Sequence, residues 1–229
     1  MCIRDRIRTD KPDPSTQEES TAIWRVTVKD ADERKVGRAF ADANVHTALA
    51  SIPGMYGLGG GPSAATPFGV YRPAKIDAGL VPQYVHVLGG GTTQLDSVAP
   101  TGSTVEVDVP APTAPGSGPV TRAPLGSVVG ARSGDKGGNA NIGVFARSAE
   151  AFAWLDAFLT EERLGELLPE VASLSVERFR LPRIWSLNFV VHGLLQEGVA
   201  ASTRQDAQAK AVGEWLRARV VDIPTVLLD

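Results

Sequence analysis

A proline-rich run divides this sequence more sharply than any other feature. Prolines stand at positions 110, 112, 115, 119 and 124 of the stretch PAPTAPGSGPVTRAP, with glycine and serine between them. Proline fixes its own backbone torsion and has no N–H to donate, so helix interiors and central strands exclude it. Such a run forms an extended, semi-rigid spacer. We therefore predict a linker at residues 110–124 and a separate domain at residues 125–229.

Composition and charge exclude some classes of protein. Hydrophobic side chains make up 43% of the 229 residues, which supports a real core, and the formal net charge is −3. Basic residues are interspersed with acidic ones and form no block, so we expect no nucleic-acid partner. No apolar run approaches the length of a membrane span, and no signal-peptide pattern is present. We expect a cytoplasmic protein with no membrane partner.

Cysteine and histidine limit the metal chemistry. Cys2 is the single cysteine, which excludes an intramolecular disulfide and a cysteine-based metal site. The three histidines, His46, His86 and His192, lie far apart in the sequence. This spacing argues against a histidine-rich metal site, while a site built from carboxylates stays open. We predict no metal ligands.

The first 21 residues have no apolar period and are rich in charge, proline and hydroxyl groups. Such a composition is typical of a segment without regular structure. The opening letters MCIRDR also resemble a translated sequencing-adapter scar. We therefore predict that residues 1–21 are a disordered or artefactual tail and that the chain is a fragment of a longer protein.

Residues 22–109 carry a mixture of strand and helix signals. Trp24–Lys29 alternates apolar and polar residues, and the following segment has helical spacing up to Pro53. A long loop rich in glycine and proline follows, which is a pattern typical of functional or disordered loops. The elements we expect are a strand at 24–29, a helix at 31–51, and strands at 83–88 and 103–109.

Residues 125–229 also contain segments with the two-residue period of a strand and segments with the period of a helix. Strand character at 126–130 and 142–146 flanks a polar loop, Ser148 is a natural helix N-cap, and residues 185–195 fit either a strand or a helix. The remaining expected elements are a helix at 161–168, a strand at 174–181, a helix that Asp206 caps, and a strand at 220–228. This order predicts an α+β fold with two helices on one face of a mostly antiparallel sheet.

The polar loop reads ARSGDKGGNANIGV at residues 131–144 and is the best candidate site. Glycines permit positive φ, so successive backbone N–H groups can converge on an anion, and basic side chains add charge. The stretch does not match a Walker A loop. The alternative is a hairpin turn in which Asp135 and Asn139 bond their own backbone, and the two interpretations weigh equally. The candidate ligand-binding residues are Arg132, Ser133, Gly134, Lys136, Gly137, Asn139 and Asn141.

A second polar group lies in WSLNFVVHGLL. Asn188 and His192 share one side of a helix or one face of a strand, and Asn188 joins the candidate ligand-binding residues. His192 is the single histidine of this domain and is suited to acid–base chemistry near neutral pH, although a hydrogen-bonded packing histidine is the commoner case. Our candidate catalytic residues are His192 and Asp135.

Several blocks of the sequence resemble a known family. ARSGDKGGNANIGV, LPRIWSLNFVVHGLL and RQDAQAKAVG resemble the C-terminal part of the acyclic terpene utilisation protein A family. KDADERKVGRAF, SIPGMYG and TPFGVYRPA resemble the end of that family's large N-terminal domain. The resemblance implies a ferredoxin-like α/β sandwich at residues 125–229, preceded at residues 22–109 by the truncated end of a larger α/β domain.

The resemblance also implies a functional setting. The family is linked to bacterial degradation of acyclic terpenes, which proceeds through coenzyme A thioesters. It implies part of an acyl-CoA-processing enzyme that holds a small anionic substrate or an acyl-CoA, with no cofactor identified. The alternative is a non-catalytic module that docks on a partner subunit or on the large domain. Exposed strand edges would also allow a homo-oligomer.

Overall fold

The computed structural model describes residues 2–50, 53–58, 64–96, 113, 116 and 118–228. The chain separates into two compact units, Met1–Gly69 and Val70–Asp229. The expected strand at 103–109 and residues 110–112, 114, 115 and 117 of the linker expected at 110–124 lie outside the described residues. The predicted domain boundaries therefore stay predictions.

The first unit begins with a strand pair. β1 (Cys2–Ile7) pairs with β2 (Ile23–Val28) in an antiparallel register that runs from Cys2↔Val28 to Ile7↔Ile23. Residues 1–21 are thus not devoid of regular structure, contrary to the prediction from their composition. A charged segment can form a strand when a neighbour satisfies its backbone hydrogen bonds, and β2 is that neighbour.

Two helices replace the single helix expected at residues 31–51. α1 (Glu33–Val36) and α2 (Arg38–Ala50) meet at Gly37, whose N–H donates to the carbonyl of Glu33. A Cβ atom at Gly37 would lie 2.9 Å from that carbonyl oxygen, so this backbone path requires glycine. The helical spacing of the sequence does not reveal such a local break.

The second unit starts with an extended segment and a short hairpin. β3 (Gln83–His86) pairs with β4 (Thr92–Leu95), and every residue of both strands is exposed. The strand expected at 83–88 is confirmed with a shorter end, whereas β4 is absent from the sequence prediction. Single-turn 3-10 helices occupy Glu18–Ser20 in the first unit and Ala78–Leu80 here.

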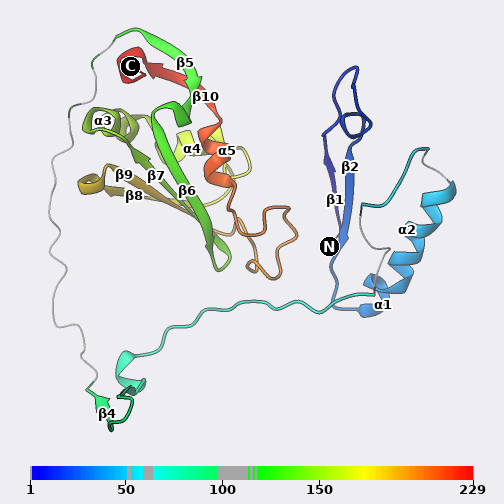
Figure 1. Ribbon diagram of the computed structural model, residues 1–229, viewed down its shortest axis with the longest axis horizontal. Helices are drawn as coiled ribbons and strands as arrows, with labels where there is room; N and C mark the ends of the chain where they lie inside the picture. Colours follow the sequence, from blue (N-terminus) through cyan, green and yellow to red (C-terminus); the bar gives the residue numbers. More distant parts are fainter. Residues whose placement is uncertain are drawn as a thin grey trace. The chain divides into compact units, whose positions relative to one another are not determined.

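Residues 118–228 form a small α+β domain, called the small domain below (Figure 1). Four of its strands form an antiparallel sheet in the order β6-β7-β9-β8, and the remaining two strands, β5 and β10, pair with each other. Short 3-10 turns occupy Leu125–Ser127, Pro182–Ile184 and Thr225–Leu227. The elements are β5 (Val120–Pro124), β6 (Val129–Lys136), β7 (Asn139–Ala146), α3 (Ala149–Phe158), α4 (Glu161–Leu167), β8 (Val176–Leu181), β9 (Ser186–Val191), α5 (Val212–Arg217) and β10 (Val220–Pro224).

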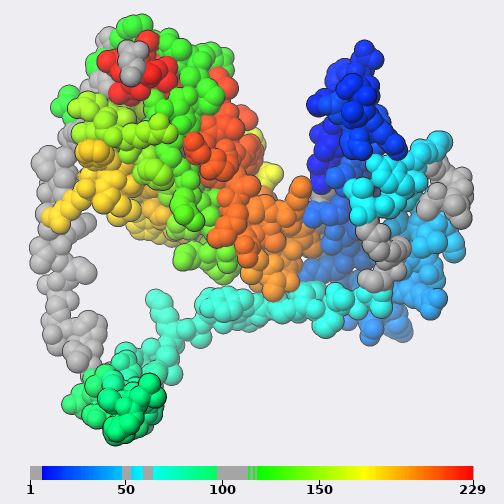
Figure 2. Space-filling model, viewed as in Figure 1, coloured from blue at the N-terminus to red at the C-terminus, as the bar shows by residue number. Residues whose placement is uncertain are grey.

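The core of the small domain lies between one face of the sheet and its helices. Ile142 of β7 and Phe189 of β9 are fully buried, as are Phe152 of α3, Leu164 of α4 and Leu216 of α5. Side chains alternate across a strand, so the burial of every second residue marks the face that the helices cover. The space-filling view shows these elements packed into one continuous body (Figure 2). The predicted α+β fold is confirmed.

The structure resolves one open alternative for this domain and changes two expectations. The ambiguous residues 185–195 contain the strand β9, and β5 lies inside the stretch that we expected to be a linker. The last helix starts at Val212 rather than after Asp206. The Asp206 carboxylate instead accepts hydrogen bonds from the backbone N–H groups of Lys210 and Ala211, which holds a non-helical turn.

Candidate functional site

The stretch ARSGDKGGNANIGV is a β-hairpin and not a long loop. β6 continues to Lys136 and β7 begins at Asn139, so Gly137 and Gly138 alone make the turn. Gly137 has φ of +61°, which suits the left-handed conformation that two-residue hairpin turns require. The sequence misleads here because its glycines and asparagines are typical of loops.

The hairpin turn is packed against the segment that follows β9. A Cβ atom at Gly138 would lie 2.1 Å from the carbonyl oxygen of Gln196, so the two backbones are in close contact. Leu195 donates its N–H to the carbonyl of Gly138, and Gly193 donates to the Asn139 side-chain oxygen at 3.0 Å. These contacts give Gly138 and Asn139 a structural role and favour the plain-turn interpretation over a converging anion nest.

The face of the sheet opposite the helices, called the open face below, gathers most of the candidate residues. Strand register places Arg132 beside Gly143, Gly143 beside Asn188, and Asn188 beside Phe179. Residues two apart on each strand share that face. The open face therefore consists of Gly130, Arg132, Gly134 and Lys136 on β6, Asn139, Asn141, Gly143 and Phe145 on β7, Ser186, Asn188 and Val190 on β9, and Glu177, Phe179 and Leu181 on β8.

Ser133 and Asp135 alternate to the other face, toward α5. The Ser133 hydroxyl accepts the backbone N–H of Gly213 at 2.8 Å and donates to the carbonyl of Lys210 at 3.2 Å. An oxygen in this position satisfies a backbone donor of the first helical turn, as an N-cap side chain does. The structure thus separates Ser133 and Asp135 from the other candidates.

Three cations lie on the β6 side of the open face. The side chains of Arg132 and Lys136 are exposed there. The Lys210 ammonium lies 3.1 Å from the position that a Cβ atom at Gly134 would occupy, so it covers that glycine. Within residues 118–228, no carboxylate forms an ion pair with Arg132, Lys136 or Lys210. Lys210 reaches the face from the turn before α5 and was not among the candidate ligand-binding residues.

Two asparagines form a reciprocal pair at the centre of the open face. The Asn141 amide donates to the Asn188 oxygen at 2.8 Å, and the Asn188 amide donates to the Asn141 oxygen at 3.1 Å. Each amide carries a second N–H and a second oxygen lone pair for a further partner. The register of β7 places Asn139 on the same face as Asn141.

His192 lies one residue beyond the end of β9, at the end of the sheet that holds Asn139. Its Nε2 atom is 2.5 Å from a carboxylate oxygen of Glu177, and both side chains are partly exposed. A hydrogen bond between the imidazole and the carboxylate fixes the orientation of the ring. Sequence reasoning missed Glu177, although the alternation along β8 placed it on the same face as Phe179.

The opposite end of the open face is apolar. The side chains of Phe145, Phe179 and Leu181 are 44%, 45% and 43% exposed. The Phe145 ring covers Gly130 on the neighbouring strand, since a Cβ atom there would lie 2.2 Å from the ring. The open face thus combines cations that have no carboxylate partner within the small domain, amide groups, an imidazole–carboxylate pair and half-exposed rings.

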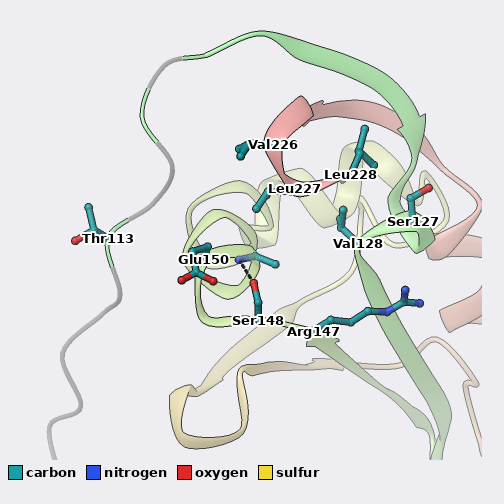
Figure 3. A pocket seen from close by; sticks show the side chains of 10 residues that line it. Thr113, Ser127, Val128, Arg147, Ser148, Glu150, Val226, Leu227 and Leu228 are labelled. Atoms are coloured by element: carbon teal, nitrogen blue, oxygen red, sulfur yellow. Dashed lines mark hydrogen bonds between the residues drawn. The ribbon is translucent and has the colours of Figure 1, made fainter.

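A separate hollow lies at the start of α3 (Figure 3). The Ser148 hydroxyl there accepts the N–H of Ala151 and so caps α3, as the sequence predicts. None of the candidate residues from the sequence lines this hollow. The lining residues are Thr113, Ser127, Val128, Arg147, Ser148, Glu150, Ala151, Val226, Leu227 and Leu228.

In the part of the chain that the structure describes, no group of three or more histidine, cysteine, aspartate or glutamate side chains could hold a metal ion. None of the helices described there is long and apolar enough to cross a lipid bilayer.

Comparison with known families agrees with the architecture. The family model described as "AtuA ferredoxin-like domain" matches residues 123–222, and the one described as "Acyclic terpene utilisation family protein AtuA" matches residues 3–87. Searches of curated proteins and of solved structures gave no significant match. The first match spans the small domain and its open face, and the second spans the strand pair and helices of the first unit. The chain therefore belongs to the acyclic terpene utilisation protein A family.

Proposed function

We propose that the open face of the small domain binds an anionic compound, such as an acyl-CoA or an isoprenoid acid, in the catabolism of acyclic terpenes. Family membership supports the terpene utilisation context. The observation that carries the proposal is that Arg132, Lys136 and Lys210 occupy one face without a carboxylate partner in the small domain. This location replaces the glycine nest that the sequence suggested.

Electrostatics explain why these cations favour a ligand. Like charges on one surface raise the local potential and attract anions from solution. Three cations held by one strand and one adjoining turn need little rearrangement to contact the same ligand, and such preorganisation lowers the entropic cost of binding. A carboxylate or phosphate can accept a bidentate pair of hydrogen bonds from Arg132.

Other open-face groups would take defined roles toward such a ligand. The spare N–H groups of Asn141 and Asn188 would donate to a carbonyl oxygen above the sheet. His192, paired with Glu177, is our candidate proton carrier in an acyl-CoA-processing reaction. Asp135 has no part in this proposal, because the register places it on the helix-facing side.

Binding measurements on the full chain test the proposal. We expect coenzyme A, short acyl-CoAs or isoprenoid acids to raise the unfolding temperature and to give a measurable Kd by calorimetry. Replacing Arg132, Lys136 and Lys210 together with glutamine should weaken binding at least about tenfold, because each lost contact to an anion removes a charge-assisted hydrogen bond.

Arg219 supplies the matched control. It is exposed and lies after α5, away from the open face. Arg219→Gln makes the same chemical change and should leave Kd unchanged. Absence of binding by every compound, or an equal loss in Arg219→Gln, would contradict the proposal.

A second candidate function is a docking module, which the half-exposed Phe179 and Leu181 favour. Isolated exposed apolar residues are ordinary, but a cluster on one sheet face is typical of an interaction surface. If the open face pairs with a second copy, sedimentation should show a dimer that Phe179→Ser with Leu181→Ser converts to a monomer. A monomer at all concentrations in the unchanged chain would exclude this self-association.

A further inference from the structure

We infer that the open face recognises a nucleoside phosphate, with the phosphate groups on the cations and the base on the half-exposed rings. The inference rests on the proposed function and names the chemical class of its ligand. It follows from the order of chemical groups across the sheet. Cations lie on β6, amides on β7 and β9, and an aromatic ring on β8.

The dimensions of the sheet suit a ligand of this size. Arg132, Gly143, Asn188 and Phe179 form one row across four neighbouring strands. Strands lie about 4.8 Å apart, so the row spans roughly 14 Å from end to end. The flexible Arg132 and Lys210 side chains shorten that distance toward a phosphate. A nucleoside with one or two phosphates can therefore contact both ends of the row.

The centre of the row leaves room for a flat group. A Cβ atom at Gly143 would meet no atom closer than the Arg132 carbonyl oxygen at 3.7 Å and the Asn188 side-chain oxygen at 3.9 Å. The nearest neighbours are thus at ordinary contact distance, and Gly143 itself is only half-buried. A sugar or a planar ring can approach the backbone here as it could not over a larger side chain.

The pair of asparagine amides provides hydrogen-bond donors and acceptors for the edge of a nucleobase. Asn141 and Asn188 use one donor and one acceptor each on each other, which leaves one N–H and one oxygen lone pair per residue. The shared edge of each amide is occupied by the other asparagine, so each remaining N–H or lone pair can form one hydrogen bond to a base edge. The half-exposed ring of Phe179 on the next strand supplies a surface for base stacking.

Charge favours a mononucleotide over a nucleic-acid strand. The net charge of the chain is −3, and its basic residues form no continuous block. A polynucleotide requires a basic track along several phosphates. The three cations on β6 and its adjoining turn suffice for one phosphate cluster. We therefore assign the face to a small nucleoside phosphate.

Calorimetry on the full chain with four probes tests the inference. The probes are adenosine 3′,5′-bisphosphate, ribose 5-phosphate, adenosine and inorganic phosphate. We expect the bisphosphate to bind at least about tenfold more tightly than ribose 5-phosphate or adenosine, because it alone engages both ends of the row. Inorganic phosphate should bind most weakly and compete with the bisphosphate.

Two variants separate the base contact from the phosphate contact. Phe179→Leu should weaken the bisphosphate about tenfold and leave ribose 5-phosphate unchanged, since leucine keeps the apolar volume but removes the stacking ring. Lys210→Gln should weaken both compounds. Tyr84→Leu is the matched control, because Tyr84 is 51% exposed on the separate β3–β4 hairpin and should have no effect.

The outcomes distinguish this inference from the proposed function. If ribose 5-phosphate and the bisphosphate bind equally and Phe179→Leu changes neither, the nucleoside assignment is overturned while anion binding stands. Absence of binding by every phosphate probe, with isoprenoid acids still bound, also overturns the assignment alone. Tighter binding of a single-stranded RNA oligonucleotide than of the bisphosphate would replace the mononucleotide with a nucleic acid. An unchanged unfolding temperature in each variant confirms that folding is intact.

Discussion

The unit Met1–Gly69 and the small domain both contain strands and helices, yet they differ in what they bury. Among the first unit's described side chains, only Gly37 and Ala41 are buried. The small domain buries a cluster that includes Phe152 and Phe189, because helices cover one face of its sheet. Strand pairing alone does not remove much apolar surface from water, whereas a second layer does. We expect the stability of the chain to reside mainly in the small domain.

The largest effect should come from the core of the small domain. Phe152→Ala should lower the free energy of unfolding by about 3–5 kcal/mol, since it removes a fully buried ring and leaves a cavity. Trp24→Ala in the first unit should change the main transition by less than about 0.5 kcal/mol, because Trp24 is 49% exposed. Urea unfolding followed by far-UV circular dichroism measures both. Equal losses would contradict the comparison.

Substitutions at two glycines test the same difference in burial between the first unit and the small domain. Gly138→Ala forces a methyl group to within 2.1 Å of the Gln196 carbonyl oxygen and should cost about 2 kcal/mol. Gly37→Ala produces a similar clash, at 2.9 Å from the Glu33 carbonyl oxygen. This second change should alter the short helices of the first unit and leave the main transition in place. A shift of the midpoint by Gly37→Ala would show that the two regions unfold together.

The smallest expected effect concerns charge. Asp156 at the end of α3 binds Arg178 at 2.6 Å and Arg180 at 2.8 Å, and the Asp156 side chain is only 15% exposed. Asp156→Asn should lower the free energy of unfolding by about 1 kcal/mol, because it weakens charge-assisted hydrogen bonds. The Arg34–Asp32 pair of the first unit is more exposed, so Asp32→Asn should leave the main transition unchanged.

The Asp156 contribution should depend on pH. Burial raises the pKa of Asp156, but hydrogen bonds from Arg180 and Arg178 outweigh it, and the net pKa lies below its ordinary value. A lowered folded-state pKa stabilises the fold above the unfolded pKa of about 3.9, and this stabilisation is lost as pH falls through the folded value. The difference between the unchanged chain and Asp156→Asn should therefore shrink below about pH 4. A constant difference across that range would exclude this cause.

The sequence correctly predicts the helices and strands that bury one face and expose the other. Ser148 caps α3 as expected, and the alternation around Val176–Leu181 marks β8 correctly. Sequence periodicity does not identify a strand where contacts from distant segments compensate for residues that disfavour strands. The Phe145 ring shields Gly130 and Asn188 pairs with Asn141, so β6 and β7 remain strands despite a loop-like composition.

The same reasoning applies to the candidate site. The sequence identifies Arg132, Lys136 and Asn188 as candidates, and the register then places them on one face. It cannot pair His192 with Glu177 or bring Lys210 over the sheet, because those contacts depend on how segments far apart in the chain meet. Local sequence pattern thus identifies candidate site residues, and tertiary contacts determine which of them lie on one surface.

The pairing of β5 with β10 has a consequence for protein engineering. Val120 at the start of the entering strand lies opposite Pro224 at the end of the leaving strand, so the chain enters and leaves the small domain side by side. Neighbouring ends of this kind favour circular permutation and insertion into a loop of another protein. A short glycine-rich peptide could join the two ends, with a new opening placed at an exposed position such as Ser173. The small domain could then serve as a portable cassette whose open face is presented on a host of choice.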